Sequence, residues 1–429
     1  MRVTRRTTAA VATAVALIMT LAACGGTPGE AAAPSVRNHT NVSVYTWWAA
    51  GVEKTGLDAL VTVFEEQHPD IEFKNDSVTG GGGSAAKDNL QSRLENQNPP
   101  DTFLVHAGAE LDDYIKGGYV QDVSGLYKKF GLTDVFPKDL IRQLSTDDGK
   151  IYSVPSNIHR ANMMWANPKV LQDNGIDPSA EYDSIDAFIA DLDKLEQAGV
   201  TPLSVGTTWT QVHLLETVLL GTLGPDAYSG LWDGTTDWTS LEVTTALQNF
   251  KTLMSYTNAD RSNLDWPEAT QMVIDGDAAF NIMGDWAVSA FDEAEMKLGT
   301  DYVAVPAPGT AGTFDFLADS FTMSANILDP ENTEAWLETV SSVEGQVTFN
   351  KIKGSIPART DIDRDEFTEY QRMAIKSFDE DTIVSSLAHG AAVPVSRLNA
   401  ITEATNDFVG DNGHQDVATF QAALAATTN

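Results

Sequence analysis

The sequence predicts an α/β protein with two lobes, and three observations support this fold class. Strand-like runs alternate with helical patterns near the start of the chain, which indicates βαβ units and a mostly parallel sheet. With 429 residues, the chain is long enough for two or three domains. An extended, apolar-rich stretch at residues 149–167, interrupted by Pro155, is typical of a chain that crosses between lobes. We therefore expect two lobes.

The first 23 residues have the layout of a secretory signal. Arg2, Arg5 and Arg6 precede an apolar run that ends before Cys24. This run is short for a membrane-spanning helix, which needs about 20 consecutive apolar residues. Residues 24–40 are small and rich in Pro and Gly, which predicts a flexible tether. Because Cys24 is the only cysteine, no internal disulfide is expected, and stability must come from core packing.

The composition is strongly acidic. Sixty-one Asp and Glu residues stand against 27 Lys and Arg residues, for a formal net charge of −34. Such a chain is repelled by nucleic acid and anionic lipid, so no nucleic-acid partner is expected. The acidic residues are scattered and form no block, which indicates a solvated surface and gives no further clue to function.

The expected elements begin with a strand at residues 42–46. Apolar residues at helical spacing then predict a helix that Pro69 ends; they are Leu57, Leu60, Val61 and Phe64. A strand at 71–78, a helix through Leu90 and Leu94 and a strand at 101–106 follow. Glycines 80–83 between them lack the pattern of a phosphate-binding loop, so they are interpreted as a plain loop.

Later parts of the chain continue the alternation. Ser184 is suited to cap a helix that ends at Gly199. Further helices are expected at residues 241–254, 267–275, 333–343 and 366–378, with a strand at 278–283 and a closing helix from Asp416.

Residues 44–53, V-Y-T-W-W-A-A-G-V-E, carry two adjacent tryptophans. Neighbouring side chains on a strand point to opposite faces, so the two indoles cannot both enter one core. Two interpretations stay open at this point. Both rings could be core or lid residues, since tryptophan is usually buried. Alternatively, one indole could stack on a pyranose ring while Glu53 accepts hydrogen bonds from the hydroxyl groups at its edge.

Several motifs in one order decide between these interpretations. They are the ending Leu21-Ala22-Ala23-Cys24-Gly25, Trp47-Trp48 with Glu53, Pro100–Phe103 leading to His106-Ala107-Gly108, the crossing at 149–160, Met283–Ala287, Ala318–Phe321, Lys353–Pro357 and Leu387–Gly390. Together they resemble the sugar-binding lipoproteins of bacterial ABC importers, in extracellular solute-binding protein family 1, and most of all the glucose/galactose branch. The resemblance covers essentially the whole chain after the signal.

The resemblance implies a class II, maltose-binding-protein-like fold with a hinge and a cleft between the lobes. Residues 41–157 and 320–360 would form the N-terminal lobe, and residues 158–319 and 361–429 the C-terminal lobe. The ligand-binding residues would be Trp48, Glu53, His106, Trp266, Trp286, Asp319, Lys353 and His389, with Trp47 and Trp209 as weaker candidates. Of the tandem pair, Trp48 is expected to face the sugar and Trp47 to pack. An apolar Leu104, where relatives can carry a polar residue, leaves the identity of the sugar open.

The resemblance also implies how the protein is placed and what it meets. Cys24 would carry a lipid that anchors the exported chain to the outer face of the cytoplasmic membrane. The lobes would close over a monosaccharide, a glucose-type hexose first of all, and deliver it to the subunits of an ABC permease. A monomer is expected, with no cofactor and no catalytic residue.

Each site residue also has a structural explanation when taken alone: surface charges for Lys353 and Asp319, core packing for Trp286. The alternative from another class is a surface-tethered glycoside hydrolase, because carboxylates among tryptophans also suit that chemistry. A purely structural or adhesive lipoprotein is the third possible function.

No metal site is expected, since the seven histidines include no pair three or four residues apart. The two D-x-D motifs, at Asp191 and Asp361, are interpreted as solvated acids.

Overall fold

The computed structural model describes residues 40–78, 84–410 and 416–428. The predicted signal at 1–23, the lipidation site Cys24, nearly all of the tether at 24–40 and the glycine loop at 80–83 lie outside the described residues. Among the helices of the described part, none is long and apolar enough to cross a membrane.

A five-stranded sheet in the order β2-β1-β3-β11-β4 forms the first lobe. Its strands are β1 (Asn41–Tyr45), β2 (Glu72–Asn75), β3 (Thr102–His106), β4 (Ser153–Pro155) and β11 (Asp319–Thr322). Strands β2, β1 and β3 run parallel, whereas β11 is antiparallel to both β3 and β4. The mostly parallel sheet that the sequence predicts is therefore found with one reversed strand. The predicted strand at 71–78 is shorter than expected.

A four-stranded sheet in the order β7-β8-β6-β9 forms the second lobe. Its strands are β6 (Met163–Ala166), β7 (Thr201–Ser204), β8 (Ala278–Ile282) and β9 (Val303–Pro306). Strand β6 is antiparallel to β8 and β9, while β7 and β8 are parallel. Each of the two lobe sheets has one strand of opposite direction, β11 in the first lobe and β6 in the second. The chain enters each of these strands just after it leaves the other lobe.

A small sheet in the order β12-β10-β5 accompanies the crossings. It consists of β5 (His159–Arg160), β10 (Thr313–Leu317) and β12 (Thr382–Ser385). Strand β5 follows β4 in the chain, and a single residue separates β10 from β11. The predicted crossing at 149–167 thus consists of three short strands, β4, β5 and β6, that belong to three different sheets.

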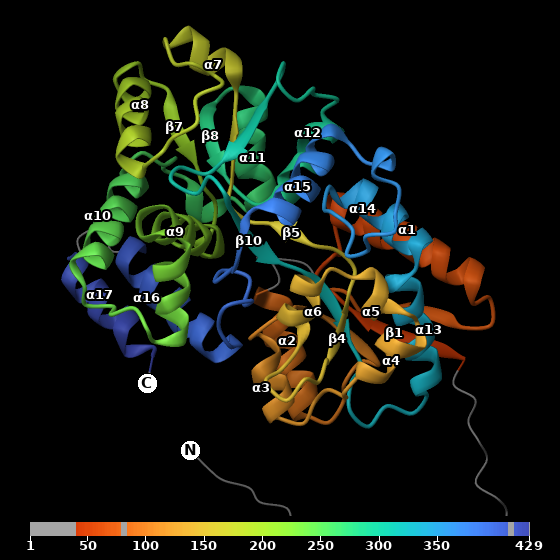
Figure 1. The fold of residues 1–429 in the computed structure, drawn as a ribbon. Coiled ribbons are helices and arrows are strands. Elements are labelled where there is room, and N and C mark those ends of the chain that lie inside the picture. Colours follow the sequence, from red (N-terminus) through yellow and green to blue (C-terminus); the bar gives the residue numbers. More distant parts are fainter. Residues whose placement is uncertain (1–39, 79–83, 411–415, 429) are drawn as a thin grey trace, which may run out of the picture. The chain divides into compact units, whose positions relative to one another are not determined.

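The helices surround these sheets, and Figure 1 shows α8 beside β7, α11 beside β8, and α1 beside α14. In the first lobe they are α1 (Gly51–Gln67), α2 (Ser84–Glu95), α3 (Leu111–Lys116), α4 (Ser124–Lys129), α5 (Leu132–Val135), α6 (Lys138–Leu144), α13 (Pro330–Ser341) and α14 (Val343–Lys353). The remaining α-helices are α7 (Pro168–Asp173), α8 (Ile185–Gln197), α9 (Thr208–Asp233), α10 (Leu241–Ser255), α11 (Trp266–Asp275), α12 (Val288–Glu293), α15 (Glu369–Glu380), α16 (Val395–Gly410) and α17 (Val417–Ala426). Short 3₁₀ turns are η2 (Arg261–Asn263), η3 (Asp285–Ala287) and η4 (Arg364–Glu366).

Local sequence signals set several helix ends. Ser184 caps α8 by accepting a hydrogen bond from the Ala187 amide, as predicted. Asp265 and Glu268 form a reciprocal capping box at the start of α11. The predicted helices ending at Pro69 and starting at Asp416 are confirmed as α1 and α17. In contrast, α9 was not predicted, and the predicted helix at 333–343 is the main part of α13.

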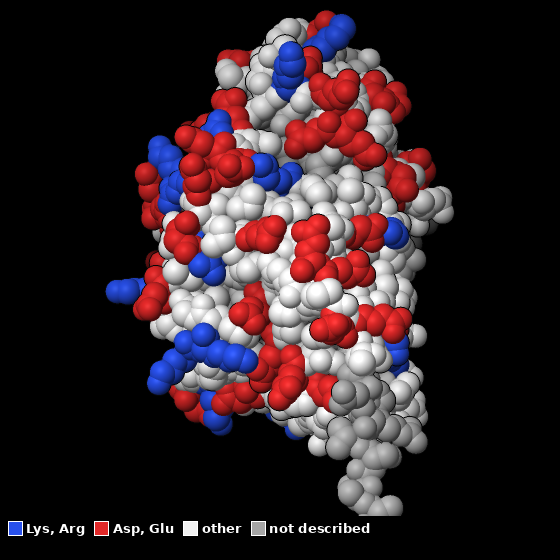
Figure 2. Space-filling view, turned by 90° about the vertical axis from the view of Figure 1, so that its right-hand side faces the viewer, with Lys and Arg blue, Asp and Glu red and all other residues white. Residues whose placement is uncertain are grey.

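The apolar core is continuous from the first lobe into the second. One cluster of buried side chains covers the five-stranded sheet and continues through Ile158 and Met163 to Trp165, Phe291 and Tyr302. A second cluster fills the space around α9, α10 and β8. On the face seen in Figure 2, acidic side chains are spread among fewer basic ones, in agreement with the scattered acids of the sequence.

Candidate functional site

A cavity between the two lobes holds most of the side chains that the sequence singled out. Its lining is aromatic and charged, and it contains about 350 Å³ of space not filled by atoms. The lining residues are Trp47, Glu53, His106, His159, Trp209, Trp266, Trp286, Leu317, Asp319, Lys353 and His389. Seven of the eight first candidates line this cavity, and so do both weaker ones. His159 and Leu317 were not predicted.

Strand pairing brings His106 and Asp319 together. His106 is the last residue of β3 and Asp319 the first of β11, and the antiparallel register places them opposite each other. The His106 Nε2 atom lies 3.6 Å from an Asp319 carboxylate oxygen. On its other side, the His106 Nδ1 atom lies 2.9 Å from Glu110, which also accepts a 2.8 Å hydrogen bond from Lys87. His106 is thereby held between two carboxylates.

Two helix ends place Glu53 and Lys353 against each other. Glu53 lies in the first turn of α1 and Lys353 is the last residue of α14, so each charge suits the dipole of its own helix. The Lys353 ammonium donates a 2.5 Å hydrogen bond to Glu53. Gly354 follows with a φ of 80°, and a Cβ atom there would lie 2.3 Å from the Val288 side chain. This close contact of α14 with α12 needs a glycine.

The tandem tryptophans are placed the opposite way from the prediction. Trp48, expected to face the ligand, is fully buried, with its ring 4.9 Å from Phe349 and 5.8 Å from Phe321. Trp47, expected to pack, lines the cavity with its ring 5.1 Å from His106. Both tryptophans follow β1, which ends at Tyr45, so strand alternation does not decide which of them enters the core.

One carboxylate contacts two tryptophans of the second lobe, one through its indole and one through its backbone. Asp265 accepts a 2.7 Å hydrogen bond from the Trp209 ring nitrogen and also accepts from the Trp266 amide at the start of α11. The ring of Trp209 lies 6.5 Å from that of Trp286, which in turn lies 4.9 Å from His389. The second lobe therefore offers an aromatic wall held by polar contacts from behind.

Electrostatics keep Asp319 ionised. Burial alone would raise the pKa of Asp319, but the hydrogen bond and charge of His159, with the charges of Lys353 and His106, hold this pKa well below its usual value. Burial also opposes the charge on His159, yet Asp285 and Asp319 raise the pKa of His159 above its ordinary value. In contrast, burial and nearby positive groups place the pKa of His389 well below its usual value, so His389 is neutral.

His389 belongs to a buried polar cluster behind the cavity. The Ser386 hydroxyl donates to Glu216 at 2.9 Å and lies 2.8 Å from the His389 Nδ1 atom, while the His389 Nε2 atom has no hydrogen-bond partner among the described residues. Burial raises the pKa of neighbouring Asp315 well above its usual value, and the Glu216 carboxylate raises this pKa further.

Within the described residues, His213, Glu216 and His389 form the group that could hold a metal ion, with ligand atoms all within 4.8 Å of one another. In a tetrahedral zinc site with Zn–N bonds of about 2.0–2.1 Å, ligand atoms lie only about 3.4 Å apart. The side chains would have to move closer to bind an ion. His213 and Glu216 lie three residues apart in α9, but His389 comes from a distant part of the chain, and the sequence analysis considered only pairs of histidines.

The two lobes touch beside the cavity through what we call the clasp, residues 108–110 and 390–391. The Ala109 amide donates to the Ala391 carbonyl at 3.1 Å, and the Glu110 amide donates to the Gly390 carbonyl at 2.8 Å. A Cβ atom on Gly390, whose φ is 72°, would lie 2.8 Å from the Glu110 carboxylate. His106 and His389 flank the clasp, so the lobes are closed where these side chains meet.

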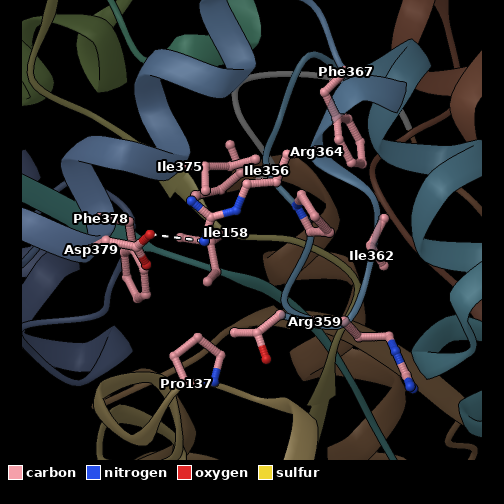
Figure 3. A pocket seen from close by; sticks show the side chains of 12 residues that line it. Pro137, Ile158, Ile356, Arg359, Ile362, Arg364, Phe367, Ile375, Phe378 and Asp379 are labelled. Carbon is pink, nitrogen blue, oxygen red and sulfur yellow. Dashed lines mark hydrogen bonds and ion pairs between the residues drawn. The ribbon is translucent and has the colours of Figure 1, made fainter.

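A different pocket lies on the other side of the crossing segment, and Figure 3 shows it from close by. Ile158 lines this pocket, whereas the next residue, His159, lines the candidate site. Successive side chains of an extended segment point to opposite faces, which accounts for the separation. The pocket is lined by isoleucine, phenylalanine and proline side chains, with the ion pair of Arg364 and Asp379 at 2.9 Å.

Relatives resemble the chain over nearly its full length. An ABC transporter extracellular-binding protein of Pyrococcus horikoshii is 35% identical over 94% of this chain and 92% of its own length. A probable sugar-binding periplasmic protein of Rhizobium meliloti is 33% identical, covering 92% and 96%. A xylose/arabinose-binding protein of Haloferax volcanii is 31% identical, covering 91% and 85%.

Solved structures share the fold at low sequence identity. A bacterial solute receptor with a preference for β-D-galactopyranose has a TM-score of 0.79 at 16% identity, covering 91% of this chain and 98% of the receptor. A chitin oligosaccharide binding protein has a TM-score of 0.78 at 21% identity, covering 91% and 99%. The predicted two-lobed, maltose-binding-protein-like fold is thereby confirmed. The sequence profile of the bacterial extracellular solute-binding proteins matches residues 43–347, and this chain belongs to that family.

Proposed function

We propose that this protein captures a monosaccharide in the cavity between its lobes and delivers it to an ABC permease in the membrane. A glucose-type hexose is the leading candidate. The proposal agrees with the sugar-binding and ABC-transporter relatives named above. It assigns ligand contacts to the cavity-lining residues Trp47, Glu53, His106, Trp209, Trp266, Trp286, Asp319, Lys353 and His389.

The observation that carries the proposal is the pairing of indoles with charged hydrogen-bonding groups in one cavity. A pyranose has apolar C–H faces, which suit indole rings, and an edge of hydroxyl groups, which suits charged donors and acceptors. Asp319 accepts hydrogen bonds, Lys353 donates them, and the unpartnered Nε2 atom of neutral His389 can do either. Hydrogen bonds to charged groups contribute about 1.5–3 kcal/mol each. A micromolar dissociation constant, about −8 kcal/mol, is therefore within reach.

The cavity is much smaller than a neighbouring groove, which favours a ligand of a single sugar ring. Trp209 also lines this larger groove, which lies between α2, α3, α9 and α16. Only a ligand of more than one ring would need to extend past Trp209 into this groove.

Sugar capture suits the cavity carboxylates better than glycoside hydrolysis does. A glycosidase needs one protonated carboxyl group that donates a proton to the leaving oxygen. The neighbours of Asp319 hold its pKa below the usual value, so it stays ionised near neutral pH. Glu53 is bound to the Lys353 ammonium at 2.5 Å. Both carboxylates are thus arranged to accept hydrogen bonds.

Calorimetric titration tests the proposal. Purified protein is titrated with glucose, galactose, mannose, xylose and maltose. We expect 1:1 binding of at least one monosaccharide and no release of free sugar from a glycoside. No heat from any monosaccharide would refute the proposal. Tighter binding of maltose than of every monosaccharide would contradict a single-ring ligand and indicate that the ligand extends into the groove.

We further propose how the chain is organised around this function. The lobes would comprise residues 41–157 with 320–360 and residues 158–319 with 361–429, except that Asp319 pairs with His106 in the sheet of the first lobe. They would close by hinge bending at the crossings. The clasp would form on closure. Cys24 would carry the lipid anchor at the outer face of the cytoplasmic membrane, and the protein would act as a monomer.

A further inference from the structure

His159 lies between two carboxylates that belong to different lobes. Its Nδ1 atom is hydrogen-bonded to Asp285, and its Nε2 atom lies 3.3 Å from an Asp319 oxygen. Asn157 adds a second path, because its side-chain amide donates to Asp319 at 2.8 Å and lies 3.0 Å from the His159 Nε2 atom. All three charged or titratable groups are buried, at 1% exposure for His159, 0% for Asp285 and 3% for Asp319.

Each carboxylate is directly attached to one wall of the candidate site. Asp285 opens the turn η3 and is followed at once by Trp286, a part of the aromatic wall. A second hydrogen bond, from the Arg160 amide at 2.9 Å, fixes its other oxygen. Asp319 faces the cavity itself and is paired with His106 in the sheet. The ring of His159 also meets the Trp286 ring edge-on at 5.3 Å.

We propose that His159 is a positioning residue that holds Asp319 of the first lobe and Trp286 of the second in the arrangement that binds the sugar. This inference rests on the proposed function. One imidazole thus contacts the hydroxyl acceptor Asp319 through one ring nitrogen and Asp285, the residue before the stacking ring of Trp286, through the other. Loss of either contact would let one wall move relative to the other.

The two ring nitrogens can be tested separately. An asparagine amide reaches about as far as Nδ1 and a glutamine amide about as far as Nε2, so His159→Asn keeps the contact to Asp285 and His159→Gln keeps the contact to Asp319. His159→Leu fills the space and makes neither contact. Ile158→Leu is the matched control, since that side chain lies in the same segment but lines the other pocket.

In calorimetry with the best-bound monosaccharide, we expect His159→Leu to weaken binding by at least about tenfold, the equivalent of one lost hydrogen bond to a charged group. His159→Asn and His159→Gln should each fall between His159→Leu and the unchanged protein, and Ile158→Leu should bind normally. A residue that only fills space would give the opposite order, with leucine tolerated. Normal binding by His159→Leu would overturn the inference.

A measurement without sugar separates this inference from the proposed function. The ring proton between His159 and Asp285 is buried, so proton NMR of the sugar-free protein should show a slowly exchanging downfield imidazole resonance. It should disappear in His159→Leu, shift in Asp285→Asn and persist in Ile158→Leu. Absence of this resonance from the unchanged protein would overturn the inference even if sugar binds. If the resonance is present and no sugar binds, the proposed function fails while the link between the lobes stands.

Discussion

Removal of the Lys353 ammonium should weaken sugar binding much more than it weakens the fold. Lys353 is 4% exposed, and its Nζ atom lies 2.5 Å from Glu53 and 5.6 Å from the centre of the Trp48 ring. In Lys353→Met the apolar stem is kept and the donor is lost. One hydrogen bond from a charged donor is worth about 1.5–3 kcal/mol, so the dissociation constant should rise by roughly 10- to 150-fold.

Lys351→Met is the matched control for this change. Lys351 lies in the same helix and forms a 2.7 Å ion pair with Glu366, but both side chains are exposed. Such pairs contribute about 0–1 kcal/mol, and no sugar contact is involved. Calorimetry measures affinity, and thermal unfolding without sugar measures stability. A dissociation constant for Lys353→Met within twofold of the unchanged protein would refute the assignment, and an equal loss in Lys351→Met would show an effect through the helix.

Three further changes test the site, the closure and the buried cluster. Trp47→Ala should lower sugar affinity, whereas Trp48→Ala should lower stability more, by about 3–5 kcal/mol of unfolding free energy, since Trp48 is fully buried and Trp47 borders the cavity; the reverse pattern would restore the original prediction. Gly390→Ala should weaken sugar binding because its Cβ atom would strike Glu110 in the clasp, whereas Gly175→Ala, with a similar φ of 70° and nothing within 4 Å, should bind normally. Asp315→Asn should raise the unfolding free energy at pH 7. The pKa of Asp315 is raised in the folded state, so the unfolded state ionises first, and stability falls by up to about 1.4 kcal/mol per pH unit as the pH rises from about 3.9 toward the folded pKa; denaturant titrations at pH 4 and pH 7 should show a smaller loss in the variant.

Local patterns sufficed for most of the elements but not for all of them. The helices α1 and α8 bury one stripe, and their periodicity predicts them. Helix α9 is different, because every residue from Thr210 to Leu220 is buried. A helix surrounded by protein has no polar face and so no amphipathic pattern. Its kink at Gly224, before Pro225, interrupts the signal further.

The resemblance singled out most of the residues that line the cavity, whereas local patterns singled out few of them. Asp319 and His106 lie more than two hundred positions apart and meet only through the register of β11 on β3, which no local signal contains. His159 was missed for a similar reason: an isolated histidine in an extended segment has many ordinary explanations. The tandem tryptophans were misassigned because both follow the end of β1 at Tyr45, where strand alternation no longer applies.

The charges of the site are arranged for a neutral ligand. Glu53 is paired with Lys353, Glu110 is bound by Lys87 and His106, and Asp285 is bound by His159. A sugar brings no charge that could compensate a buried ion, so each ion needs its partner before the ligand arrives. Because these partners already hold the side chains in place, a sugar hydroxyl group can bind them without first ordering them. The charges inside the cavity already compensate one another. The choice of ligand therefore depends on hydrogen-bond direction and ring stacking, and the strongly acidic surface has little influence on it.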